Sequence, residues 1–113
     1  MNKEKEREYA IKKLQEFRKD AAEAAMRLAY PYFACINIDE HTNRDGFAFH
    51  YNVSIFTHET ESGEYAEQIA YFNENWYEWR DGSENLNNLV MCLCRFEAAV
   101  KDYTKETKKE TAA

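Results

Sequence analysis

Residues 47–57 read FAFHYNVSIFT, and the alternation in this stretch decides the fold. Every second side chain is aromatic or β-branched, and the residues between them are mostly small or polar. The first set is Phe47, Phe49, Tyr51, Val53, Ile55 and Thr57, and the second is Ala48, His50, Asn52, Ser54 and Phe56. A period of two is the pattern of a β-strand with one face in a core. We therefore expect a long central strand over residues 47–57.

Amphipathic helices flank this strand on both sides along the chain. Residues 2–29 are rich in Glu, Lys, Arg and Ala, with apolar residues at three- and four-residue steps, which predicts one long helix. It should end before Pro31, because proline disfavours helical geometry in the residue before it. A more apolar stripe runs through residues 86–103, and either Asp81 with a glutamate three residues later or Ser83 alone can cap its start.

Two further strands complete the expected sheet. Residues 32–39 alternate in the same way, and a polar loop is expected over residues 40–46. Residues 64–73 fit either a strand returning from a Ser62-Gly63 turn or a helix, because their apolar residues suit both periods. We favour the strand, since two strands under two long helices would be marginal. The expected fold is α+β, in the order α-β-β-β-α, with a three-stranded antiparallel sheet and both long helices packed on one face.

The composition indicates one domain in a reducing compartment. The chain has 113 residues, 44% of them hydrophobic, which suffices for a single α+β domain over residues 1–106 with a frayed polar tail over residues 107–113. The three cysteines are an odd number, and the chain begins with Lys-Glu repeats and not with a signal peptide. No apolar run approaches the roughly 20 residues that cross a bilayer. We expect a cytoplasmic protein with no membrane association.

The charge distribution restricts the classes of partner. The net charge is −6, and residues 35–85 carry eleven acidic residues against Arg44 and Arg80. Such a field repels nucleic-acid phosphates and anionic lipids. Small acidic proteins of mobile elements that mimic nucleic acid, including some inhibitors of bacterial defence nucleases, are similar in size and charge. An acidic nucleic-acid mimic that inhibits a nucleic-acid-binding protein is therefore one interpretation.

The order α-β-β-β-α resembles the double-stranded RNA-binding domain in its topology. That family carries a cluster of lysines at the start of its second helix, where this chain has Ser83, Glu84 and Asn85. The resemblance therefore implies the fold alone, and we expect no direct binding of nucleic acid.

Motifs for catalysis, metals or cofactors do not emerge from the residue spacing. His50 and His58 share a strand face but lie eight residues apart, about 26 Å in an extended chain, and His41 falls in the expected loop, away from both. Cys92 and Cys94 lie two apart on a helix, so their side chains point to different faces. The three glycines form no phosphate-binding loop. We expect no enzyme activity, no metal and no cofactor.

The sheet face that points away from the helices is the first candidate binding surface. A two-residue turn after the central strand would place Ile69 opposite Phe56 and Tyr71 opposite Ser54. Such an aromatic patch either binds a partner or is covered by a loop of the chain itself.

A second candidate surface follows along the chain. It spans residues 71–79, where five aromatic residues interleave with Glu74 and Glu78: Tyr71, Phe72, Trp76, Tyr77 and Trp79. Trp and Tyr are frequent interface anchors, and acids beside them select a basic partner. The alternative is a helix-capping loop whose rings pack into the domain. The favoured function is a small protein-binding module without catalytic activity that acts through this aromatic and acidic surface. The module is also a candidate homodimer. A small-molecule or enzymatic site is the third interpretation.

Overall fold

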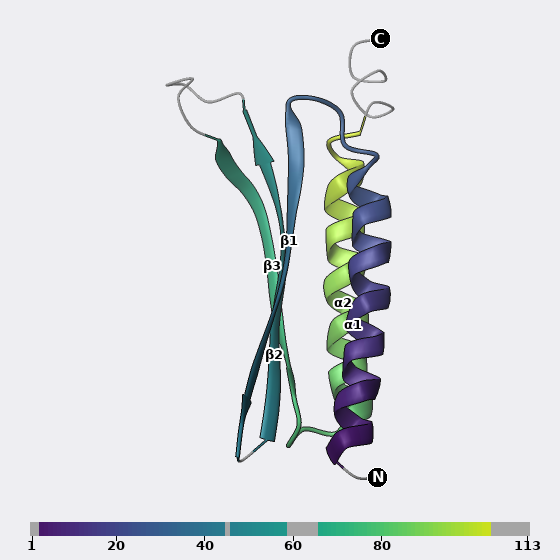
Figure 1. Cartoon of the computed structure of the whole chain (residues 1–113). Helices are drawn as coiled ribbons and strands as arrows, with labels where there is room; N and C mark the ends of the chain where they lie inside the picture. Colours follow the sequence, from purple (N-terminus) through teal and green to yellow (C-terminus); the bar gives the residue numbers. More distant parts are fainter. Residues whose placement is uncertain (1–2, 45, 59–65, 105–113) are drawn as a thin grey trace.

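The computed structural model describes residues 3–44, 46–58 and 66–104, and it confirms the predicted fold (Figure 1). The elements in chain order are α1 (Lys3–Ala25), β1 (Tyr32–Asn43), β2 (Gly46–Thr57), β3 (Glu67–Tyr77) and α2 (Gly82–Lys101). The strands form one antiparallel sheet in the order β1-β2-β3, so the chain runs through it as a meander. Both helices lie side by side on one face of this sheet.

The first hairpin corrects the prediction of a loop over residues 40–46. The pairing of β1 with β2 continues to Asn43 opposite Gly46, so residues 40–43 are part of the strand. The long β2 supplies backbone partners for these polar residues, and Glu40 accepts two hydrogen bonds from the Arg7 guanidinium of α1, at 2.6 and 2.8 Å. These bonds lower the pKa of the Glu40 carboxyl. Gly46 has φ +144°, a conformation that side chains disfavour.

The third strand confirms the strand alternative for residues 64–73 and corrects the predicted ends of that strand. The segment that fitted strand or helix is a strand, but β3 continues to Tyr77 and the connection to α2 is correspondingly short. Tyr71 lies opposite Ser54, as the sequence predicts. Beyond that point the register shifts between Ile55 and Phe56, which puts Gln68 and not Ile69 opposite Phe56. The Ser62-Gly63 turn lies outside the described residues.

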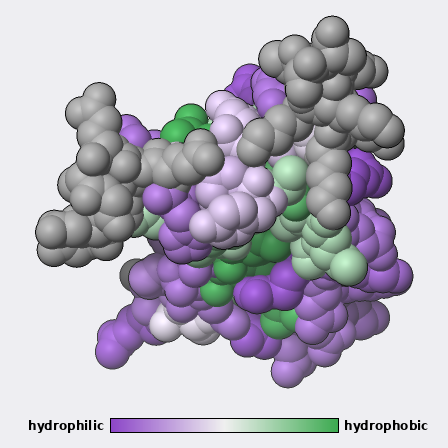
Figure 2. Space-filling model, turned by 90° about the horizontal axis from the view of Figure 1, so that it is seen from above, coloured by the Kyte–Doolittle hydropathy of each residue, from purple (hydrophilic) through white to green (hydrophobic). Residues whose placement is uncertain are grey.

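The core fills the space between the helices and the inner face of the sheet. The odd-numbered side chains of β2 are buried, as their alternation predicts, and Phe17 of α1 meets the Tyr51 ring edge-to-face at 5.3 Å. Alanines at positions 10, 21 and 24 let α1 approach closely. Seen from the end where β1 begins, hydrophobic residues gather between hydrophilic ones (Figure 2). Within the described part of the chain, neither helix has a stretch apolar enough to span a membrane.

Helix ends follow local hydrogen bonds. α1 ends at Ala25, four residues earlier than expected, because the chain turns there and the Ala29 N–H donates to the Tyr103 carbonyl beyond α2. At the start of α2, Asp81 is the N-cap and its carboxylate accepts the Ser83 N–H at 2.8 Å. Both hydrogen bonds from Ser83, from its hydroxyl and its N–H, lower the pKa of Asp81.

Candidate functional site

The outer face of the sheet is free of any described helix or strand (Figure 1). Because side chains alternate along a strand, the residues that face outward follow from the register and from the buried inner set. They are Phe33, Cys35, Asn37, Asp39 and His41 of β1; Ala48, His50, Asn52, Ser54 and Phe56 of β2; and Tyr71, Asn73, Asn75 and Tyr77 of β3. The face combines aromatic rings at its two ends with amides in the middle.

Asparagines form a row across the middle of this face. Asn37, Asn52 and Asn73 lie directly opposite one another on the three strands. The Asn37 amide donates to the Asn52 Oδ1 at 3.2 Å, and the Asn73 amide donates to the Tyr71 hydroxyl at 3.3 Å. Each amide has two donors and an acceptor, so the row can bind polar groups from outside. An apolar helix packed here would leave those groups unpaired.

One end of the face carries a stacked cluster around Phe56. The Phe33 and Phe56 rings stack at 5.4 Å between centroids, and the His58 ring stacks on Phe33 at 4.6 Å. Tyr30 extends the stack over His58 and is 81% exposed. Phe56 therefore points outward as predicted. Ile69 does not join it, because the register shift turns Ile69 toward the hydrophobic core, where it is half-buried.

The opposite end carries a cluster of Tyr77, Trp79 and Arg80, called here the Trp79 cluster. The Tyr77 and Trp79 rings stack at 4.9 Å with 19° between their planes, and Trp79 is 77% exposed. The Arg80 guanidinium lies 4.8 Å from the Tyr77 ring centre and donates to the Asn75 carbonyl at 3.2 Å. These contacts hold a large flat surface in one orientation although it is exposed to solvent.

Trp76 is predicted from the sequence to lie on the binding surface, and the structure places it in the core. It is only 3% exposed and meets Tyr9 of α1 edge-to-face at 6.1 Å. The strand continues through Tyr77, so alternation turns Trp76 inward and Tyr77 outward. The segment is thus divided, with one tryptophan in the core and the other on the surface. By the same alternation, Glu74 and Glu78 face the helices.

His41 and His50 lie together, which corrects the expectation that His41 is remote from the other histidines. Their ring centroids are 4.7 Å apart, because β2 pairs with β1 as far as Asn43 and therefore runs alongside His41. The His50 ring is hydrogen-bonded to the Asn75 side chain on the neighbouring strand. Among the described residues, no group of three or more His, Cys, Asp or Glu side chains is placed to hold a metal ion.

Glu78 lies beneath the Trp79 cluster. Its Oε2 accepts the Phe47 N–H at 3.1 Å, and a side chain at Gly46 would collide with this carboxylate. Its Oε1 is buried and accepts no hydrogen bond from a described residue, with the Lys3 ammonium 3.9 Å away. A hollow of about 510 Å³ opens beside it, lined in part by Lys3, His41, Tyr77 and Trp79. A carboxylate in this position can accept a hydrogen bond from a bound cation.

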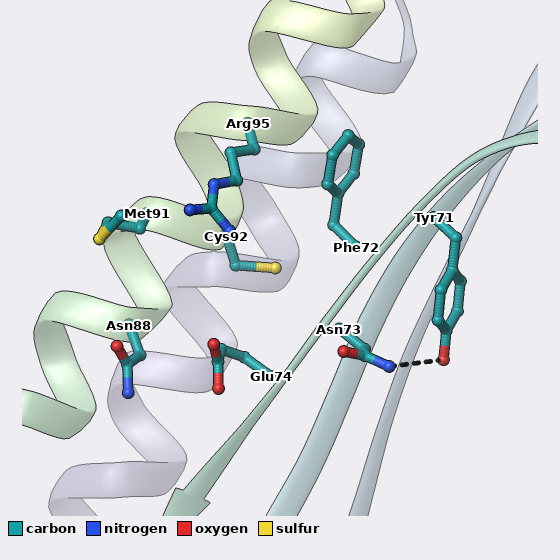
Figure 3. Close-up of a pocket in the computed structure, with 8 residues that line it drawn as sticks. All are labelled: Tyr71, Phe72, Asn73, Glu74, Asn88, Met91, Cys92 and Arg95. Carbon is teal, nitrogen blue, oxygen red and sulfur yellow. Dashed lines mark hydrogen bonds between the residues drawn. The ribbon is translucent and has the colours of Figure 1, made fainter.

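A second hollow, of about 260 Å³, lies between α2 and the free edge of β3 (Figure 3). Glu74 points into it from the strand, and Asn88, Cys92 and Arg95 point into it from the helix. Tyr71 and Asn73 lie on the other side of the strand. We call it the α2–β3 groove.

The Cys92 thiol forms the floor of the α2–β3 groove. Burial, with a smaller contribution from the nearby Glu74 charge, raises the pKa of this thiol to about 11. Tyr51, which pairs with Glu74 across the sheet, has a buried hydroxyl without a hydrogen-bond partner among the described residues, and burial raises its pKa as well. The thiol is therefore protonated at neutral pH and is a poor nucleophile.

Comparison with models of protein families, with curated proteins and with solved structures finds no match. Two surfaces of the described residues offer groups for binding. These are the outer sheet face with its Trp79 cluster and the α2–β3 groove.

Sequence reasoning missed the groove and the asparagine row, although each left a signal. Asn88, Cys92 and Arg95 follow one another at four- and three-residue steps, the spacing of a single helix face. The asparagines 37, 52 and 73 occupy outward positions of their strands, but their alignment depends on a register that only the fold supplies. Attention to aromatic residues and histidines concealed both patterns.

Proposed function

We propose that the protein is a protein-binding module without catalytic activity, and that a basic partner docks on the outer sheet face at the Trp79 cluster. The observation that carries the proposal is the exposure of Trp79, which stacks on Tyr77 at the end of a face without a described covering element. An aromatic surface of this size is costly to leave in water, and Trp and Tyr are the residues that most often dominate binding energy. The stack also holds the ring in place before binding, which reduces the entropy lost on association.

The charges beside the cluster favour a lysine or arginine side chain from the partner. Glu78 Oε1 is buried without a hydrogen-bond donor among the described residues, and its ion-pair contact with Lys3 is long, at 3.9 Å. Lys3 is itself mostly exposed. A cationic side chain entering the hollow beside Tyr77 can donate to this carboxylate and lie against the aromatic rings. The overall charge of −6 attracts such a partner from a distance.

Cysteine and histidine side chains are the described groups most often used in catalysis, and their surroundings here favour binding over chemistry. Cys92 has a pKa raised to about 11 and lacks thiolate character at neutral pH. His50 is engaged by the Asn75 side chain. The surface groups described here offer hydrogen bonds and aromatic contacts, which suit recognition.

The nucleic-acid mimic has less support than a binding module. A mimic needs its acids spaced along one continuous surface, whereas the described acids point in different directions. Asp39 lies on the outer face, Glu40 pairs with Arg7 on the helix side, and Glu78 is half-buried and accepts the Phe47 N–H. Six further acids, Asp45, Glu59, Glu61, Glu64, Glu106 and Glu110, lie outside the described residues.

Affinity capture with matched variants tests the docking surface. Trp79→Ala is expected to reduce recovery of basic partners about tenfold or more, because truncating a central aromatic anchor costs about 2 kcal/mol or more of binding energy. Tyr30→Ala, at the other end of the same face, removes an equally exposed ring and is expected to leave recovery unchanged. Quantitative mass spectrometry of the captured proteins provides the measurement.

Two outcomes contradict this proposal. One is equal recovery of the same proteins by the native chain and Trp79→Ala. The other is release of the captured partner by added DNA or RNA, which identifies a nucleic-acid mimic in place of the module.

A second copy of the chain is the candidate occupant of the opposite end of the face. The Phe33 and Phe56 stack is half-buried and lies on the side of the sheet that no described helix or strand covers. Light scattering at high micromolar concentration is expected to give about twice the monomer mass of 13.4 kDa. Phe56→Asp should return the monomer with unchanged circular dichroism, because a charge in an apolar contact prevents association.

The control for the dimer places the same charge elsewhere. Val90 is an exposed apolar residue on α2, away from the outer face, so Val90→Asp should remain a dimer. A monomer mass for the native chain, or equal dissociation by both substitutions, would exclude association through Phe56.

A further inference from the structure

The α2–β3 groove brings opposite charges together without pairing them. Glu74 contributes a carboxylate from the edge strand, and Arg95 contributes a guanidinium from α2 (Figure 3). No hydrogen bond or ion pair joins Arg95 or Asn88 to another described residue, and the Glu74 carboxylate accepts one bond, from the Asn75 N–H at 3.3 Å. The two charged groups therefore keep most of their hydrogen-bonding capacity free toward the groove.

The Cys92 thiol lies close enough to Glu74 and Arg95 to be influenced by both charges. Cys92 is buried below the groove, and its titration is influenced by Glu74 in one direction and by Arg95 in the other. In Figure 3 the Cys92 sulfur points from α2 toward the strand, the Glu74 carboxylate points from β3 toward the helix, and the Arg95 guanidinium lies beside Cys92. Phe72 and Met91 add apolar surface to the lining. The groove thus offers an anion acceptor, a cation acceptor, an amide and a small apolar wall.

We propose that the α2–β3 groove binds a small zwitterion of the α-amino-acid type. Its carboxylate would accept the paired N–H groups of Arg95, and its ammonium would donate to Glu74. The Asn88 amide can serve either group, and the aliphatic part would contact Phe72. The volume of about 260 Å³ lies below the range of roughly 300 to 1,000 Å³ that drug-sized ligands occupy, so the ligand is small.

Ligands with a single charge fit the groove less well. A simple carboxylate would leave Glu74 facing its negative charge, and a simple amine would leave Arg95 facing its positive charge. A zwitterion places its negative charge at Arg95 and its positive charge at Glu74, so both contacts are attractive. Covalent capture is not part of the proposal, because Cys92 keeps its proton at neutral pH.

Titration followed by amide NMR on the whole chain tests the groove. The probes are glycine, L-serine, L-leucine, L-glutamate and L-lysine, each raised to about 10 mM, a concentration at which millimolar binding becomes visible. At least one should cause saturable shifts in the amides of residues 72–74 and 88–95. Acetate and methylamine at the same concentration should cause shifts several-fold smaller.

Charge-removing variants of similar shape locate the binding. Glu74→Gln and Arg95→Gln should each weaken the best probe about tenfold, the usual effect of losing a charge-assisted hydrogen bond. Glu97→Gln on the same helix and Arg18→Gln on α1 remove the same charges outside the groove and should bind like the native chain. Arg95 is exposed, so its variant folds even if Glu74→Gln disturbs the strand.

Three results would overturn the zwitterion site. They are an absence of saturable shifts with all five amino acids, binding of acetate as tight as that of the best amino acid, and native affinity in both groove variants. The groove lies on the helix side of β3 and the Trp79 cluster on the other side, so Trp79→Ala leaves this titration unchanged. Failure of one proposal is therefore distinguishable from failure of the other.

Discussion

Replacing Trp76 by alanine is expected to lower the free energy of unfolding by about 3 to 5 kcal/mol, whereas Trp79→Ala should change it by about 0.5 kcal/mol or less. Trp76 is 3% exposed, faces the helices from β3 and packs edge-to-face on Tyr9. Its truncation leaves a large cavity in a close-packed core. Trp79 is 77% exposed, so its removal sacrifices little buried area.

Denaturant unfolding of the two alanine variants gives this comparison directly. Single-tryptophan variants give an independent one: Trp79→Phe retains only the buried indole and should emit at shorter wavelength with weak acrylamide quenching. Trp76→Phe retains only the exposed indole and should emit near free indole with efficient quenching. Equal destabilisation by the two alanine changes, or equal quenching of the two indoles, would mean that the segment is not divided between core and surface.

The fold could be predicted from the sequence because its strongest patterns are local. The alternation of residues 47–57 and the two helical stripes each depend on neighbours within a few residues of one another. The number of strands favoured a strand for the ambiguous residues 64–73, which belong largely to β3, since a two-stranded sheet gives too little platform for two long helices. The order α-β-β-β-α and the placement of both helices on one face follow from those elements.

The strand lengths could not be predicted, because long-range contacts stabilise their ends. Residues 40–43 are polar and read as a loop, yet Arg7, 33 positions earlier in the chain, holds Glu40 in place on the helix side. Extending β1 in this way also places His41 next to His50. The register shift at Phe56 is a similar case, since no residue type in that segment marks it.

Half of the predicted surface residues point outward. Phe56, Tyr71, Tyr77 and Trp79 lie on the outer side or beyond the strand end, whereas Ile69, Glu74, Trp76 and Glu78 turn toward the helices. The register shift accounts for Ile69, and the continuation of β3 accounts for the others, because alternation carried from Tyr71 to Tyr77 places the even-numbered residues inward. The sequence-based prediction ends the strand at residue 73 and treats residues 73–82 as a connection, so the alternation that separates core rings from surface rings is not applied to Trp76 and Tyr77.

Asn85→Ala is expected to destabilise the protein by about 2 to 4 kcal/mol, a large effect for a residue without an apolar side chain. Asn85 is 1% exposed near the start of α2. Its Oδ1 accepts the Tyr77 N–H at 3.2 Å, and its Nδ2 donates to the Tyr77 carbonyl at 2.8 Å. One side chain thus satisfies both main-chain groups at the end of β3 and ties the last strand to the last helix.

The loss follows from groups left behind and not from the removed amide itself. Alanine leaves the Tyr77 N–H without a partner, which costs about 1 to 3 kcal/mol, and leaves the Tyr77 carbonyl with the Arg80 N–H alone, which costs about 1 kcal/mol more. Asn85→Asp should also destabilise, because a carboxylate accepts the N–H but cannot donate to the carbonyl. Asn87→Ala, exposed on the same helix, is the matched control and should change stability by about 0.5 kcal/mol or less. Thermal unfolding measures the stability of these variants, and hydrogen exchange measures the protection of the Tyr77 amide. Native protection of that amide in Asn85→Ala would mean that the asparagine does not hold the end of β3. The Trp79 cluster beyond that end would then owe its orientation to the ring stack alone.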